Sequence, residues 1–131
     1  MAQDQEYAPG TIVWRDLTVP DADAHSRFYE SVVGWERSVH EGCDDFNMTP
    51  PGSTEPTAGV CYRAGTNAGL PPQWIVYVAV EDINRSMQET ENGGGTIIDG
   101  PRYVGNHLFC VIEDPVGAVL GLISSRPVPK K

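Results

Sequence analysis

The chain carries three histidines and three cysteines, and their spacing decides whether they can hold a metal. His25, His40 and His107 fall in separate segments, and no two of them share a spacing that directs both side chains to one ion. The cysteines are far apart and form no CxxC pair, which argues against a zinc knuckle and against a disulfide framework. We therefore expect reduced thiols and no metal cofactor.

Groups that could act as nucleophiles also lack a supporting motif. Ser53-Thr54 and Ser124-Ser125 have no strand-to-helix elbow around them, and no cysteine has an obvious base beside it. Gly93-Gly94-Gly95 follows an expected helix instead of opening one, so it predicts a helix end and not a phosphate cradle. No catalytic residue is predicted from these patterns.

The composition excludes several classes of partner. The 131 residues have a formal net charge of −9, and the two lysines are Lys130 and Lys131, so a phosphate backbone would be repelled. No apolar run reaches the roughly 18 residues that a membrane span requires. The polar segment Met1–Tyr7 does not resemble a secretory signal. We expect a cytoplasmic protein that binds neither nucleic acid nor membrane.

One segment of the chain is repeated at an offset of 61 residues. An apolar strand ends at Val19 in the first copy and at Val80 in the second, and a helix-starting aspartate follows each strand. Gly34 matches Gly95 after the expected helices. The pattern predicts helices at about residues 21–33 and 82–92.

The repeat continues in the segments that follow the helices. Pro50-Pro51-Gly52 matches Pro115-Val116-Gly117 as a turn, and residues 58–61 match residues 118–121. Each copy is then a strand, a helix and three strands, which gives an α+β fold of two tandem βαβββ modules. Because one helix cannot cover such a sheet on both faces, we expect a cup-shaped mixed sheet. The expected boundaries are a tail at 1–9, module one at 10–64, a linker at 65–72, module two at 73–125 and a tail at 126–131.

Several short motifs accompany this arrangement of strands and helices. Asp114-Pro115-Val116-Gly117 precedes the last strand, Phe28-Tyr29 stands before Val33-Gly34-Trp35, and the strand Trp74–Val78 follows two prolines. With these motifs the chain resembles the vicinal oxygen chelate superfamily of glyoxalases, bleomycin-resistance proteins and extradiol dioxygenases, over about residues 10–125. The resemblance implies a small-molecule ligand and a homodimer.

The resemblance also implies positions for a divalent ion on the first and last strands of each module. Those positions fall on Trp14, Cys61, Ile75 and Gly121. The indole of Trp14, the butyl side chain of Ile75 and the hydrogen of Gly121 cannot ligate zinc, iron or manganese. Cys61 alone would be one ligand where three or four are needed. The usual metal-ligand positions are thus lost, and it stays open whether the chain is an enzyme.

Strand alternation predicts which side chains line the cup. Leu17 and Val19 of the first strand and Val76, Val78 and Val80 of its repeat should pack on the helices, which turns the intervening residues inward. Asp16 and Arg63 would then be a charged pair in an apolar pocket. The predicted ligand-binding residues are Trp14, Asp16, Cys61, Arg63, Ile75 and Tyr77.

Three functions stay open at this point. The favoured one is binding of a small aromatic or amphipathic molecule without a metal. The alternative is a metal-dependent lyase, epimerase or dioxygenase with an atypical site built from Asp16, Cys61, His107 or Glu113. The third is a structural or interaction domain whose cup is filled.

Overall fold

The computed structural model describes residues 5–39, 45–64 and 68–130, so His40 and Cys43 lie outside the described residues. The chain divides into two compact units. The first unit is residues 15–74, and the second unit is residues 1–14 with residues 75–131. The backbone N–H of Gly10 donates to the carbonyl oxygen of Ala79, and the N–H of Ala79 donates to the carbonyl oxygen of Thr11, which holds residues 10 and 11 in the second unit.

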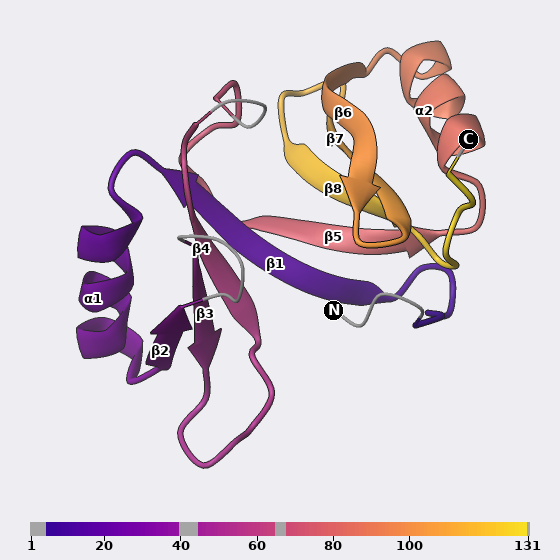
Figure 1. Cartoon of the computed structure of the whole chain (residues 1–131). Coiled ribbons are helices and arrows are strands. Elements are labelled where there is room, and N and C mark those ends of the chain that lie inside the picture. Colours follow the sequence, from indigo (N-terminus) through magenta and orange to yellow (C-terminus); the bar gives the residue numbers. More distant parts are fainter. Residues whose placement is uncertain (1–4, 40–44, 65–67, 131) are drawn as a thin grey trace. The chain divides into compact units, whose positions relative to one another are not determined.

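The first unit contains β1 from Arg15 onward, one helix and three further strands (Figure 1). Its strands pair in the order β2-β3-β4-β1, and β4 runs parallel to β1. Leu17 of β1 pairs with Val60 of β4. The elements are β1 (Ile12–Val19), α1 (Ala22–Val33), β2 (Glu36–Val39), β3 (Phe46–Thr49) and β4 (Ala58–Tyr62).

The second unit repeats this plan (Figure 1). Its strands pair in the order β5-β8-β7-β6, and β8 runs parallel to β5. The elements are β5 (Ile75–Val80), α2 (Ile83–Asn92), β6 (Thr96–Val104), β7 (His107–Glu113) and β8 (Val119–Ser124). The predicted α+β class and the order of a strand, a helix and three strands in each copy are confirmed.

Aspartate caps explain where both helices begin. Asp21 accepts a hydrogen bond from the backbone N–H of Ala24, and Asp82 accepts from those of Asn84 and Arg85. Gly34 ends α1 in the left-handed conformation with φ at 85°. In the second copy the left-handed glycine is Gly94, with φ at 91°, and not Gly95 as the sequence match predicted. Helix α2 has 10 residues against 12 in α1, and its cap Gly93, with φ at −87°, stands between the helix and the left-handed glycine.

Each unit packs its helix on one face of its strands, and in the second unit the opposite face is buried as well, at Ile75, Ala79 and Ile123. In the first unit, Leu17 and Val19 pack with Ala22 of α1. In the second unit, Val80 packs with Ile83 of α2. These contacts agree with the predicted helix-facing side at Leu17, Val19 and Val80. In β5, however, the residues predicted to line the cup, Ile75, Tyr77 and Ala79, are more deeply buried than the alternate residues that were predicted to pack on the helix.

The strand register corrects one detail of the predicted repeat. Gly59 pairs with Asp16 in the first unit, and Gly121 pairs with Tyr77 in the second. Asp16 and Tyr77 are equivalent at the offset of 61, so the partner of Gly121 in the repeat is Gly59. The sequence match had placed Cys61 there, two residues further along. No helix within the described ranges is long and apolar enough to span a membrane.

Candidate functional site

Asp16 and Cys61 lie on one face of the first unit. Asp16 pairs with Gly59, and Thr18 pairs with Cys61, so these four residues share the face that looks away from the core of Leu17 and its neighbours. Asp16 and Cys61 are both half-buried. The register therefore places a carboxylate and a thiol on the same side of neighbouring strands.

Arg63 follows β4 and is held by the backbone. Its Nη2 donates to the carbonyl oxygen of Leu70 at 3.1 Å and to that of Thr18 at 3.5 Å, and its backbone N–H donates to Val19 at 2.8 Å. Its Nε is buried and has no hydrogen-bond partner among the described residues. Leaving such a donor unsatisfied costs free energy, so an acceptor brought by a ligand would be stabilised there. The predicted pairing of Asp16 with Arg63 stays a prediction.

Trp14, Ile75 and Tyr77 belong to the second unit. Trp14 is half-buried, Ile75 is fully buried and Tyr77 is 5% exposed. Ile75 and Tyr77 alternate with the residues of β5 that face α2, so they lie on the opposite face. That the six predicted residues converge on one cavity stays a prediction.

The ring of Tyr77 lies directly over Gly121. A Cβ atom added to Gly121 would lie 2.3 Å from Cδ2 and 2.5 Å from Cε2 of that ring. A glycine inside a strand commonly marks such a close approach. No side chain fits at position 121 unless Tyr77 moves, so the ring occupies the space that a ligating side chain would need.

The ring of Tyr77 begins a row of contacts across the second unit. It meets Phe109 of β7 edge to face, with 6.1 Å between ring centroids, and the guanidinium of Arg102 lies 4.6 Å from the centroid of Phe109. Arg102 is in turn paired with Asp99. Sequence reasoning missed this row because the register of β6 against β7 shifts twice between Ile97 and Arg102, which no local pattern indicates.

The metal positions implied by the resemblance do not fit a divalent ion. The described residues contain no group of three or more His, Cys, Asp or Glu side chains that could hold one. His107 is 2% exposed, its Nε2 lies 2.7 Å from the carbonyl oxygen of Gln5, and its ring packs against Tyr7 at a centroid distance of 5.6 Å. This histidine is engaged with the start of the chain, which leaves it poorly placed to complete an atypical site.

The buried thiol of Cys110 is a poor nucleophile. Burial raises its pKa from 9.0 to about 11, and the nearby carboxylate of Asp99 adds to the rise. Because the thiolate and not the thiol is the nucleophile, Cys110 is unreactive at neutral pH. The half-buried Cys61 is the more accessible of these two thiols.

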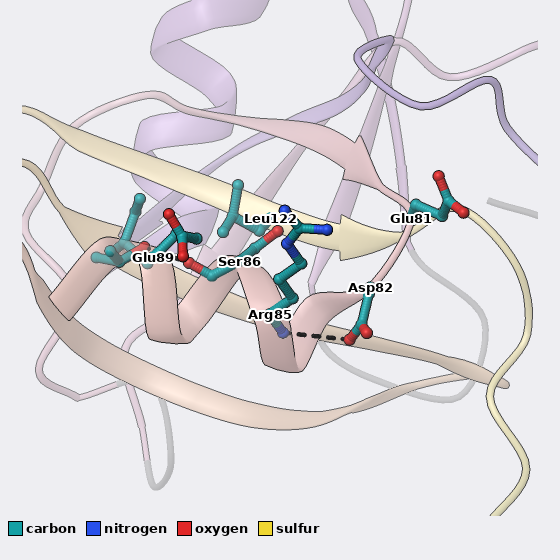
Figure 2. Close-up of a pocket in the computed structure, with 8 residues that line it drawn as sticks. Glu81, Asp82, Arg85, Ser86, Glu89 and Leu122 are labelled. Atoms are coloured by element: carbon teal, nitrogen blue, oxygen red, sulfur yellow. Dashed lines mark hydrogen bonds between the residues drawn. The ribbon is translucent and has the colours of Figure 1, made fainter. Parts of the chain in front are cut away.

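A groove of about 590 Å³ runs along α2 in the second unit (Figure 2). Its floor is apolar, from Ile112 and Leu122, and three of its six polar lining residues are acidic. It lies on the α2 side of the strands, so it is on the face opposite Tyr77. None of the predicted site residues lines it. The lining residues are Glu81, Asp82, Arg85, Ser86, Glu89, Thr90, Ile112 and Leu122.

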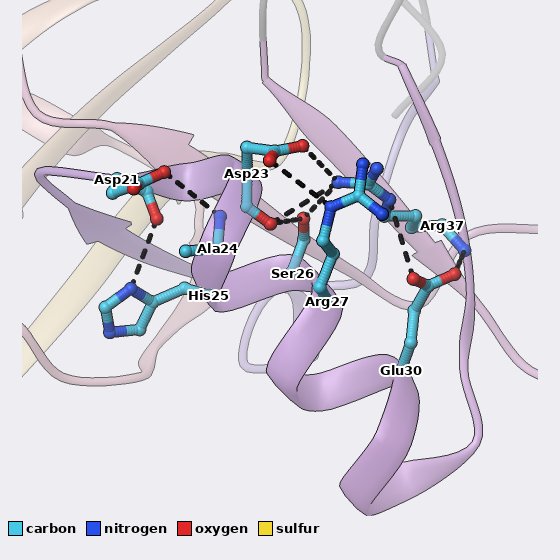
Figure 3. A network of polar contacts seen from close by, with 8 residues as sticks. All are labelled: Asp21, Asp23, Ala24, His25, Ser26, Arg27, Glu30 and Arg37. Carbon is cyan, nitrogen blue, oxygen red and sulfur yellow. Dashed lines mark hydrogen bonds and ion pairs between the residues drawn. The ribbon is translucent and has the colours of Figure 1, made fainter.

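A polar network joins α1 to β2 in the first unit (Figure 3). Arg37 of β2 donates to Asp23 Oδ1 and to Ser26 Oγ, each at 2.8 Å, and its Nε lies 3.5 Å from Glu30. The guanidinium of Arg37, followed by that of Arg27, holds the pKa of Asp23 below its usual value. The network stabilises the junction of helix and strand, and none of its members was predicted.

Comparison with known proteins identifies relatives over nearly the whole chain. The model of the Glyoxalase/Bleomycin resistance protein/Dioxygenase superfamily matches residues 11–122. CFP32 of Mycobacterium tuberculosis, which carries a glyoxylase name, is 31% identical over 126 residues and is matched over 93% of this chain. The anthracycline biosynthesis protein DnrV of Streptomyces peucetius is 30% identical over 130 residues, or 88% of this chain. The chain spans about half the length of these relatives, 48% and 47%.

Solved structures share the fold at lower identity. A superfamily member from Vibrio splendidus has a TM-score of 0.55 at 14% identity, with 87% of this chain and 99% of that chain covered. Methylmalonyl-CoA epimerase from Mycobacterium tuberculosis has a TM-score of 0.51 at 17% identity, with 98% and 93% covered. At these identities the likeness concerns the fold alone.

Proposed function

Since the chain belongs to the Glyoxalase/Bleomycin resistance protein/Dioxygenase superfamily, we propose that it binds a small aromatic or amphipathic molecule in a cup and does so without a metal. The proposed binding residues are Trp14, Asp16, Cys61, Arg63, Ile75 and Tyr77. We also propose that it works in the cytoplasm as a homodimer.

The contact of Tyr77 with Gly121 is the main observation in favour of ligand binding without a metal. The superfamily resemblance assigns a metal ligand to position 121, and here a tyrosine ring stands where that side chain would be. The equivalent strand positions Trp14 and Ile75 carry side chains that donate no electron pair to a metal. An ion would therefore have to be held by other groups, and the described residues offer no cluster of three.

The chemistry of the ligand follows from the groups proposed to meet it. The half-buried Trp14 offers aromatic surface, which favours a flat, unsaturated molecule, whereas Tyr77 is 5% exposed and its ring is packed over Gly121. The buried Nε of Arg63 has a hydrogen to donate, which favours a carbonyl, phenolate or carboxylate on that molecule. One relative is named for anthracycline biosynthesis, and anthracyclines combine fused aromatic rings with carbonyl and phenol oxygens.

A titration with a fluorescent anthracycline tests this proposal. We expect saturable binding by the wild type and a loss of about tenfold or more in Arg63→Gln, because a hydrogen bond from a charged donor contributes about 1.5–3 kcal/mol. The matched control is Arg126→Gln, whose arginine side chain is 78% exposed in the second unit. Absence of saturable binding, or equal affinities in all three proteins, would contradict the proposed site.

A further inference from the structure

The groove along α2, which we call the α2 groove, has a polar wall over an apolar floor (Figure 2). The residues of α2 that line it stand three and four positions apart, as residues on one side of a helix do. They are Asp82, Arg85, Ser86, Glu89 and Thr90. Ile112 and Leu122 of the strands form the floor. The α2 groove is therefore a space between one side of the helix and the strands on which the helix packs.

The repeated module shows what fills the corresponding place in the first unit. At the offset of 61, Thr90 of α2 corresponds to Tyr29 of α1. The strand pairing makes Val60 the counterpart of Leu122, because each follows the glycine that pairs with the equivalent residue of β1 or β5. The ring of Tyr29 packs against the core cluster that contains the fully buried Val60. An aromatic ring of the chain itself thus covers these strands in the first unit.

Thr90 cannot take the place of that ring in the second unit. Its side chain is short, and its Oγ1 donates a hydrogen bond back to the carbonyl oxygen of Ser86 at 2.8 Å. The space of about 590 Å³ therefore lies where the second unit lacks a ring that the first unit has. An apolar floor without its own covering ring favours a ligand that brings an aromatic or compact aliphatic group.

The charged side chains around the α2 groove determine which ligand charge it favours. Glu81, Asp82 and Glu89 are acidic and Arg85 is basic, so acidic groups outnumber basic ones. Asp82 is engaged as the cap of α2. The carboxylates of Glu81 and Glu89 form no ion pair with any side chain in the described part of the chain. An ammonium group placed beside them would gain an ion pair without displacing an existing one.

We propose that the α2 groove binds a small amphipathic cation, with its apolar group on Ile112 and Leu122 and its ammonium group beside Glu89. The volume of the groove lies within the range of roughly 300–1,000 Å³ that is typical of sites for small molecules. The net charge of −9 on the whole chain adds a long-range attraction for cations. The α2 groove is on the helix side of the strands, so this site does not depend on the proposed cup.

A titration with 4-phenylbutylamine, followed by the NMR signals of the methyl groups, tests the proposal. This probe combines a ring for the floor with an ammonium group on a flexible chain. We expect saturable shifts of the methyl signals of Ile112 and Leu122, and weaker binding as sodium chloride is raised, because salt screens the attraction. The uncharged 4-phenylbutanol should bind more weakly than the amine, and the anionic 4-phenylbutyrate should bind more weakly than the alcohol.

Two substitutions on α2 should change the affinity for the amine in opposite directions. We expect Glu89→Gln to weaken binding by about threefold, which is the scale of one exposed ion pair. Arg85→Gln should tighten binding by about twofold, because it removes a positive charge that repels the ammonium group. The matched control is Glu91→Gln, which removes an exposed carboxylate from the same helix at a position that does not line the groove. It should bind nearly as the wild type does.

Thr90→Tyr gives α2 the ring that α1 carries at Tyr29, so it should fill the groove and abolish binding of the amine. If this variant does not keep the circular dichroism spectrum of the wild type, the exposed positions Arg85 and Glu89 still decide the question. The proposal is overturned by an absence of saturable shifts, by equal binding of the amine and the carboxylate, or by a folded Thr90→Tyr that still binds. It is also overturned if Arg85→Gln weakens binding, or if Glu91→Gln loses as much affinity as Glu89→Gln.

Discussion

An aromatic ring lies over a glycine in the second unit. The ring of Tyr77 fills the volume above Gly121, so the glycine serves the packing of the ring and not the flexibility of the strand. The same contact removes the space for a metal ligand at that position. The position of the Tyr77 ring therefore explains both why residue 121 is a glycine and why no ligating side chain stands there.

Gly121→Ala tests this contact. Its Cβ would overlap the Tyr77 ring, so we expect the free energy of unfolding to fall by about 1–3 kcal/mol, as is typical of overpacked sites. Gly69→Ala is the control, because a Cβ atom there meets nothing within 4 Å and the backbone needs no left-handed conformation. Denaturant unfolding of both variants gives the comparison.

The double variant Tyr77→Leu with Gly121→Ala completes the test. If the ring is the obstacle, Gly121→Ala should cost less stability when Tyr77 is already replaced, because residues in contact are energetically coupled. Purely additive effects would show that the ring is not what excludes a side chain from position 121.

The elements of the fold were largely predictable because their signals are local. The aspartate caps and the spacing of apolar residues gave the two helices, and alternation gave the helix-facing residues Leu17 and Val19 of β1, whereas in β5 the face predicted to line the cup is the more deeply buried one. What the sequence did not predict depends on contacts between elements. The pairing of Tyr77 with Gly121 depends on the register of β5 against β8, and the Arg37 network depends on the packing of β2 beside α1.

Asp23→Asn tests the role of the network between α1 and β2. The pKa of Asp23 is lowered by Arg37, so the folded state favours the ionised carboxylate. Its contribution to stability is present above the pKa that this carboxylate has in the unfolded chain, and it is lost as the pH falls through the lowered pKa. We expect the melting temperature of Asp23→Asn to depend less on pH over the acidic range than that of the wild type.

Asp45→Asn serves as the comparison for the same titration. Asp45 Oδ1 accepts a hydrogen bond from the backbone N–H of Tyr62 at 3.0 Å, so this aspartate also has a structural contact, but it forms no ion pair with an arginine among the described residues. If Asp23→Asn and the wild type lose stability in parallel as the pH falls, the network does not contribute in the proposed way.

At the scale of the whole molecule, the family and the fold class rest on the entire chain, whereas the function rests on a few side chains. The superfamily model matches residues 11–122, and fold relatives with catalytic names differ from this chain at most positions. The superfamily hosts both metal enzymes and ligand-binding proteins, so fold alone does not decide between them. The departure at the metal positions is what favours binding without a metal.

The most direct test is to compare anthracycline binding by one protein sample in two states. One portion is dialysed against a chelator, which removes metal ions. The other portion is supplied with manganese or zinc. We predict equal affinity and an equal melting temperature in the two portions, because an ion bound by the native state alone would raise the melting temperature. Binding only by the metal-loaded portion, or a melting temperature that falls by several degrees on chelation, would contradict the central claim that the ligand is held without a metal.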